Sequence, residues 1–216
     1  MVHERNATAD FGLTHWHKFF NPRQLLTLVT YVEIITAAKL QLQAEYEPDK
    51  VEAIATYLAL ILDRCVDLNS RLSNWIPGVI SGARASAQHS LNLMWSYPEV
   101  SGSNKLWFLC YGAVASNYSK LCTLINAKPL PIDTQQHNKT VQIDSASADT
   151  LYHIPNSSVD AIITDPPYYA TIQYAELSDF FYVWQRRVLG DIFPNLYLTE
   201  LTDKDREAVA NPSRFR

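Results

Sequence analysis

Two adjacent prolines, Pro166 and Pro167, end the most strand-like run in this chain. The run is VDAIIT, residues 159–164, which is rich in β-branched residues and follows a turn signal, Asn-Ser-Ser, at 156–158. Proline has no N–H to donate to a sheet, so a central strand must stop before these two residues. In an open α/β sheet, ligands bind beyond the carboxyl ends of the strands. The residues after the run are therefore predicted to lie where chemistry takes place.

The first half of the chain has helical periodicity with clear starts. Asn21-Pro22 predicts the start of a helix, because asparagine caps a helix and proline suits its first position. After it, apolar residues recur at helical spacing over 25–35. A second helix is predicted to begin at Pro48-Asp49. Its apolar positions are dense enough to predict burial on more than one side.

Two more helices are predicted over 86–95 and 105–125, with turn residues between them at 97–103. A linker with two prolines, at 128–131, then ends the helical pattern. The chain is therefore predicted to begin with a mostly helical region, residues 1–130. We expect this region to be an insertion or a target-recognition part.

The second half has a mixed pattern. A short strand is predicted over 141–143, the stronger strand over 159–164, and a helix over 176–188 whose aromatic residues are expected to pack in the core. Strands followed by turns and a helix are typical of α/β proteins. The predicted fold class is therefore α/β, with part of a sheet in residues 140–216 preceded by the mostly helical region.

Charge and composition exclude several classes of protein. The formal net charge is -4 and the pI is about 5.8, so the surface as a whole is not basic, although a local basic face is compatible with these values. Cys65, Cys110 and Cys122 are far apart and form no C-x-x-C pair, which predicts free thiols and no metal site. There is no signal-peptide core, and no uninterrupted apolar run approaches the ~20 residues that cross a bilayer. We expect a cytoplasmic protein without a membrane segment.

The sequence Asp-Pro-Pro-Tyr at 165–168 suits a substrate that is an amine on a planar ring. The carboxylate of Asp165 and the main-chain carbonyl of Pro166 can each accept a hydrogen bond from the amine. The prolines restrict the backbone, so these acceptors need little reorganisation as charge develops. Tyr168 supplies a flat face on which a base can stack. The alternative without chemistry is a strand exit closed by a rigid Pro-Pro turn.

This motif resembles the catalytic motif of amino-methyltransferases that act on adenine or cytosine. The longer string TDPPYYATIQYAELSDFFYVWQRR, residues 164–187, is similar to the prokaryotic adenine-specific DNA methylases described as containing a zinc ribbon. Segments 11–28 and 57–75 resemble the same family. The resemblance implies a Rossmann-like methyltransferase sheet, S-adenosyl-L-methionine as the methyl donor, and methylation of the exocyclic amine of adenine in DNA.

The resemblance also implies roles for individual residues. The target base of such enzymes is flipped out of the duplex, because its amine cannot be reached within the stack. Asp165 and Pro166 would then bind the target amine, and Pro167 would shape the turn. Tyr168 would stack on the flipped adenine. DNA is accordingly the expected partner.

Four further residues are candidates on the same grounds. Tyr169 and Tyr174 follow the motif closely and are predicted to assist substrate stacking. Ser147 and Asp149 lie where the resemblance places the adenosine of the cofactor. A complete methylase also needs a glycine-rich turn after a first strand, and none of the six glycines stands in such a pattern. Zinc-ribbon cysteine pairs are missing as well. We therefore expect a segment of a longer enzyme, with the remainder of the parent polypeptide needed for activity.

Two alternatives for the function remain open. One is an amino-methyltransferase that acts on RNA, or on cytosine in DNA, since related motifs serve those bases. The other is a catalytically inactive, nucleic-acid-binding remnant that lacks the cofactor site. The missing glycine turn favours the remnant, whereas the intact Asp165 and Tyr168 favour an active enzyme.

Several basic side chains outside the motif are candidates for contacts with anions. His15 and His17 suggest a metal or phosphate contact, but two histidines without a third ligand are more often surface or capping residues. Arg23 is in the first turn of a predicted helix, where the helix dipole is unfavourable to a cation, and this predicts a phosphate or carboxylate partner. Arg186 and Arg187 suit DNA phosphates and suit a helix C-terminus equally well.

Overall fold

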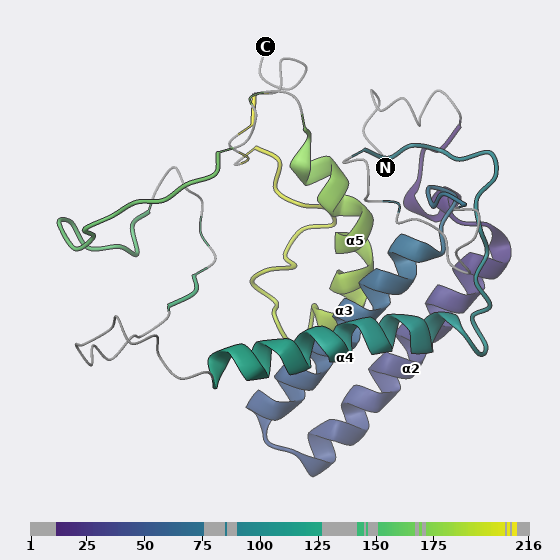
Figure 1. Cartoon of the computed structure of the whole chain (residues 1–216), viewed down its shortest axis with the longest axis horizontal. Helices are drawn as coiled ribbons and strands as arrows, with labels where there is room; N and C mark the ends of the chain where they lie inside the picture. The colour runs from purple at the N-terminus through teal and green to yellow at the C-terminus, as the bar shows by residue number, and fades with distance from the viewer. Residues whose placement is uncertain are drawn as a thin grey trace.

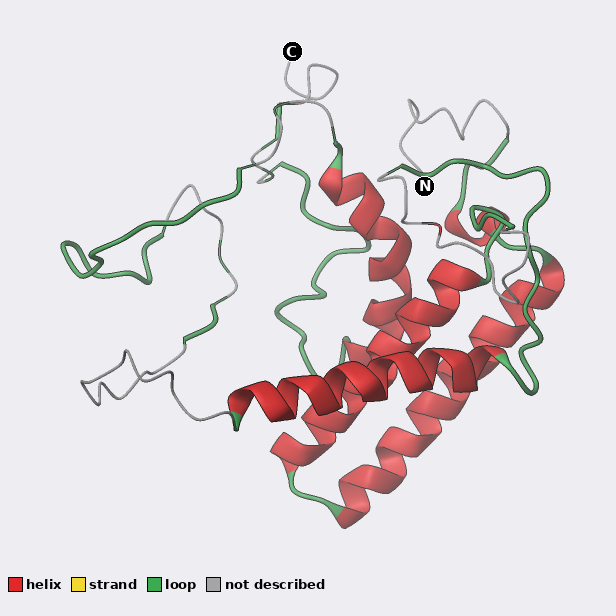
Figure 2. Ribbon diagram, in the orientation of Figure 1, coloured by secondary structure: helices red, strands yellow, loops and turns green. Residues whose placement is uncertain are grey.

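The computed structural model of this chain is built from helices (Figures 1 and 2). Its elements, within the described part, are a 3-10 helix, η1 (Trp16–Phe19), and the α-helices α2 (Pro22–Glu45), α3 (Pro48–Leu68), α4 (Leu106–Ile125) and α5 (Tyr174–Leu189). Helix α3 is central, because it packs against α2, α4 and α5, and α2 also packs against α5. The structure describes residues 12–75, 85, 90–126, 142–144, 146, 151–166, 169, 172–205, 207 and 209–210.

Helix α2 begins where the sequence predicts. The backbone N–H of Gln24 donates to the Asn21 side chain at 2.8 Å, and the Asn21 N–H donates to the Gln24 side chain at 2.9 Å. This reciprocal capping box satisfies two N–H groups that have no partner within the helix. Pro22 occupies the first helical position. Helix α2 ends at Glu45, and it cannot easily continue to Pro48, because a proline disfavours the helical conformation of the residue that precedes it.

Helix α3 confirms the prediction of burial on several sides. Its buried residues are spread around the helix, as its contacts with three other helices require. Pro48 begins the helix and Asp49 lies in its first turn, where a carboxylate interacts favourably with the helix dipole. The two-residue connection at 46–47 places α2 and α3 side by side (Figure 1).

Helix α4 is also confirmed, but the helix predicted over 86–95 is wrong for the residues that the structure describes. Residues 90–95 have no regular structure, and 86–89 lie outside the described residues. Leu91 and Leu93 pack partly against the core, and the Met94 N–H donates to the Arg71 carbonyl at 3.0 Å. Apolar residues two positions apart share a face in an extended segment and not in a helix, which explains the error.

Helix α5 belongs to the same core as the earlier helices. Phe180 is 1% exposed, and its ring lies 5.7 Å from Phe20 in a stacked arrangement. Trp184 packs edge-to-face on Phe20 at 5.4 Å, while Phe19 lies 6.2 Å from Phe180. The prediction that the aromatic residues of this helix pack in the core is confirmed. The division of the chain at residues 130–140 stays a prediction, although α5 shares its core with α2 and α3.

A buried lysine joins α2 to the end of α5. Lys39 is 3% exposed, and its ammonium group donates to the carbonyl of Val188. The same group forms a salt bridge of 2.6 Å with Asp191. A cation beside a helix C-terminus satisfies carbonyl groups that have no partner within the helix. This contact fixes the orientation of α5 relative to α2.

The predicted α/β fold class, with a partial Rossmann-like sheet, is wrong for the part of the chain that the structure describes. Residues 142–144 and 159–164 form no strand, and no strand is present elsewhere in the described ranges. Ile162 and Ile163 are 81% and 95% exposed, in a segment that extends away from the helices (Figure 1). A strand is stable only when neighbouring strands or a covering helix bury its apolar face. The local β-preference of this run therefore does not produce a sheet here.

Two other expectations can be compared with the structure. Cys65, Cys110 and Cys122 are free cysteines, as predicted, and the first two are buried. A hydrogen bond to Cys110 and burial together raise the pKa of Cys65, so this thiol stays protonated. Helix α2 is long and apolar enough to cross a membrane by length and composition, a test that core helices of soluble proteins also pass. The cytoplasmic location stays a prediction.

Candidate functional site

The predicted amine-binding residues lie on an accessible segment. Asp165 and Pro166 are both exposed and have no regular secondary structure, so the carboxylate and the main-chain carbonyl are open to a ligand. Pro167 and Tyr168 lie outside the described residues. The apolar run before Asp165 is exposed as well. Asp165 and Pro166 thus lie on a loop, and the predicted support from a buried strand is not present among the described residues.

The two tyrosines predicted to assist stacking are also accessible. Tyr169 is 78% exposed and has a φ of 50°, in the left-handed region that non-glycine residues seldom occupy. Its carbonyl accepts a hydrogen bond of 3.2 Å from the backbone N–H of Ala210. Tyr174 is the first residue of α5 and is partly exposed. The chain therefore brings Tyr169 near its C-terminal segment and places Tyr174 at the helix end that follows the motif.

A buried network fixes the C-terminal segment to the start of α5. Asp179 accepts hydrogen bonds from the backbone N–H and the hydroxyl of Thr202, at 2.9 and 2.7 Å. It also forms a salt bridge of 2.6 Å with Lys204, and both charged side chains are largely buried. The backbone N–H of Ala175 donates to the Glu207 carboxylate at 2.8 Å. Separating Asp179 from Lys204 would leave an uncompensated buried charge, which is energetically costly. The network therefore holds the C-terminal segment against α5.

The described residues do not form a cradle for S-adenosyl-L-methionine. Ser147 and Asp149, the predicted cofactor-binding residues, lie outside the described residues. A cradle of the predicted kind requires a glycine turn after a strand. The four glycines described lie in loops, in α4 or at the end of α5, and none of them follows a strand. Cofactor binding by Ser147 and Asp149 stays a prediction, and the structure adds no residue to it.

A buried carboxylate on α3 is a feature that sequence reasoning missed. One oxygen of Asp63 accepts a hydrogen bond from the Gln185 amide, and the other oxygen is buried without a hydrogen-bond partner among the described residues. Burial, and the neighbouring charge of Asp67, raise the pKa of Asp63 to about 7. Asp63 lines a pocket of about 440 Å3 between α3, α4 and α5, with Tyr57 and Phe181 among its walls. The sequence does contain a signal for it, which is an acidic residue within a helix of densely apolar pattern, although acidic residues are buried only rarely.

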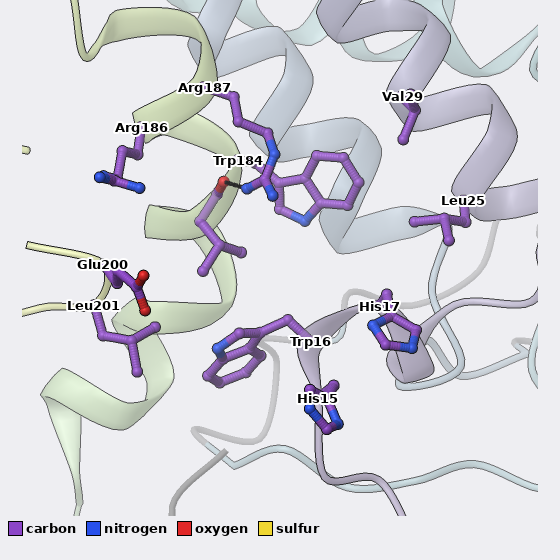
Figure 3. Close-up of a pocket in the computed structure, with 11 residues that line it drawn as sticks. His15, Trp16, His17, Leu25, Val29, Trp184, Arg186, Arg187, Glu200 and Leu201 are labelled. Carbon is purple, nitrogen blue, oxygen red and sulfur yellow. Dashed lines mark hydrogen bonds between the residues drawn. The ribbon is translucent and has the colours of Figure 1, made fainter. Parts of the chain in front are cut away.

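The structure also brings together four of the basic residues that the sequence singled out. His15, His17, Arg186 and Arg187 line one pocket of about 530 Å3 (Figure 3). Arg23 is not part of it. That residue has the carboxylate partner that its position predicts, since its guanidinium binds both oxygens of Glu99 at 2.6 and 3.0 Å. Within the described ranges, no group of three or more metal-ligating side chains is placed to hold a metal ion.

Nothing among the family models, the curated proteins or the solved structures matches this chain. The resemblance to adenine-specific DNA methylases therefore stays a prediction from the motif and its flanking residues.

Proposed function

We propose that this chain supplies the amine-binding loop of an enzyme that methylates the exocyclic amine of adenine in DNA. One observation carries the proposal: the sequence Asp-Pro-Pro-Tyr, whose Asp165 and Pro166 acceptors are both exposed. A carboxylate and a rigidly held carbonyl are a suitable pair of acceptors for the two N–H bonds of an aromatic amine.

The chemistry required of these residues is modest. Hydrogen bonds to Asp165 and Pro166 hold the amine so that its lone pair faces the methyl donor, and they stabilise the positive charge that develops on nitrogen. The proton then leaves readily, because the methylated nitrogen is cationic. S-adenosyl-L-methionine, when bound, supplies the methyl group. We assign it no binding residue within the described part of the chain.

Adenine in DNA is favoured as the target by the residues that flank the motif, since the resemblance over 164–187 is to adenine-specific enzymes. The substrate amine is accessible only after the base leaves the duplex. Tyr168 would then stack on the base, and Tyr169 and Tyr174 would lie close enough in the chain to assist. A stacked aromatic contributes about 1–3 kcal/mol per base, which offsets part of the energy of unstacking.

A second candidate function is nucleic-acid binding without methyl transfer. Two observations favour it: no glycine in the sequence follows a predicted strand, and the regular secondary-structure elements of the described residues are all helices. The two candidates differ in one product. An active enzyme leaves methylated bases in DNA, whereas a binding remnant leaves none.

Expression of the intact protein in a bacterial host without DNA methylation separates these functions. We expect N6-methyladenine in the host DNA, confined to one short sequence context, with single-molecule sequencing as the measurement. N4-methylcytosine in place of N6-methyladenine would contradict the choice of base. DNA without modification, with the protein present and folded, would support the binding remnant and overturn the proposal.

A further inference from the structure

The pocket in Figure 3 lies between two parts of the chain that are far apart in the sequence. One wall comes from α5 and the residues that follow it, with Arg186, Arg187 and Glu200. The opposite wall comes from the N-terminal segment and the start of α2, with His15 and His17. Its volume, about 530 Å3, exceeds that of a single small ion and lies within the ~300–1,000 Å3 that is typical of small-molecule sites.

Two indole groups in this pocket have no acceptor. Trp184 is 6% exposed, and its Nε1 has no hydrogen-bond partner among the described residues. The Nε1 of Trp16 is buried and without a partner in the same way. A buried N–H that remains unpaired is destabilising, so most such donors have an acceptor. Both rings are held in place by aromatic neighbours, since Trp16 stacks on Phe19 at 5.5 Å and Trp184 packs on Phe20.

The charged residues of the pocket favour an anion. Arg186 donates from Nε to the Tyr197 carbonyl at 3.3 Å, and Arg187 donates from one nitrogen to the Val183 carbonyl. A guanidinium has five N–H donors, so most donors of both side chains remain available. Among the described residues of the lining, Glu200 is the only acidic one, and it forms no salt bridge with either arginine. The two arginines and one glutamate of the described lining sum to a positive charge, in a chain whose net charge is -4.

The rest of the lining suits the apolar part of a nucleotide. Leu25, Val29, Val183 and Leu201 lie around the charged groups. A ligand that combines a negative phosphate with a sugar and a base matches this mixture of guanidinium, indole N–H and aliphatic surface. His15 and His17 also line the pocket, and their imidazole N–H groups are further donors.

We propose that this pocket binds one nucleotide unit of a DNA strand, with Arg186 and Arg187 as the phosphate ligands. The choice of DNA as the source of that phosphate rests on the proposed function. The pocket gives an acidic protein the local basic face that binding to DNA requires. Its role is to position the strand, since phosphate contacts fix the register of DNA without reading its sequence.

Binding of a fluorescent single strand of about 16 nucleotides to the purified chain, without cofactor, tests this inference separately from methylation. We expect the double variant R186Q/R187Q to bind at least about tenfold more weakly at low salt. The slope of log affinity against log salt should also become smaller by about 1. W16F, which keeps an aromatic ring and removes the indole N–H donor, should weaken binding several-fold.

The matched control is K50Q/K120Q, which removes the same charge from exposed sites outside the pocket. Equal losses in the two double variants would show a general charge effect and overturn the inference, as would wild-type affinity in R186Q/R187Q. Inorganic phosphate or adenosine monophosphate can be added at a concentration equal to that of the nucleotides in the strand. Displacement of the strand by either one would assign the pocket to a free ligand and contradict the choice of a DNA strand. If the host DNA is methylated but the salt slope of R186Q/R187Q equals that of the wild type, the proposed function stands. This pocket is then not a DNA-binding site, and the inference is overturned.

Discussion

Replacing Asp165 with alanine in the intact protein is expected to reduce methyl transfer to DNA at least about a hundredfold, with DNA affinity changed only a few-fold. The carboxylate acts on the amine while charge develops, so its loss affects the transition state more than the bound state. Asp165 is exposed and forms no hydrogen bond in the described structure, so its removal leaves the fold intact. Single-turnover transfer of labelled methyl groups measures the first effect, and fluorescence anisotropy measures the second.

Two further variants make this prediction specific. D165N keeps one side-chain carbonyl acceptor and loses the charge, so it should retain more activity than D165A. D160A removes an exposed acid from the same segment and should transfer methyl groups at close to the wild-type rate. Wild-type transfer by D165A, or an equal loss in D160A, would refute the role of Asp165.

The second large effect is expected at Asp63, where replacement by asparagine should stabilise the protein at pH 8 by on the order of 4 kcal/mol. The pKa of Asp63 is raised from 3.8 to about 7, so the folded chain holds a proton between these values that the unfolded chain has released. Stability is therefore lost as the pH rises from about 4 to about 7. Asparagine stays neutral at every pH and removes this loss, while its carbonyl can still accept from the Gln185 amide.

Urea unfolding at a series of pH values measures this difference. The two stability curves should coincide near pH 4, diverge up to about pH 7 and run parallel above it. The control is E33Q, at an exposed position on α2, which should change stability by less than about 0.5 kcal/mol at every pH. A constant difference between D63N and wild type across the pH range would contradict the raised pKa.

The helices could be predicted from the sequence because their signals are local. The Asn21 cap and the proline at the start of α3 act within one turn of the chain, and they fix the starts of these helices without help from distant residues. The aromatic face of α5 is also a local pattern, and it finds its partners Phe19 and Phe20 in the folded chain.

The predicted strand failed for the opposite reason. A strand at 159–164 depends on partners elsewhere in the chain, and the described residues offer none. Its β-branched residues fit well on a half-buried, pleated surface, but they do not form a sheet unless other strands pair with them. The same distinction explains the pocket that His15 and Arg186 share, although they are 171 positions apart in the sequence. Each residue could be singled out from the sequence, but their proximity follows from the packing of α5 against α2.

The central claim is tested most directly by methyl transfer to two duplexes that differ only in the exocyclic amine of the target base. The intact protein is given labelled S-adenosyl-L-methionine and a duplex that carries the recognised sequence, with the target adenine present or replaced by purine, which lacks only the exocyclic amine. The account predicts labelled adenine in the first duplex and no label in the second, with both duplexes bound equally well. Equal labelling of the two duplexes, or no labelling of either by folded protein, would contradict it.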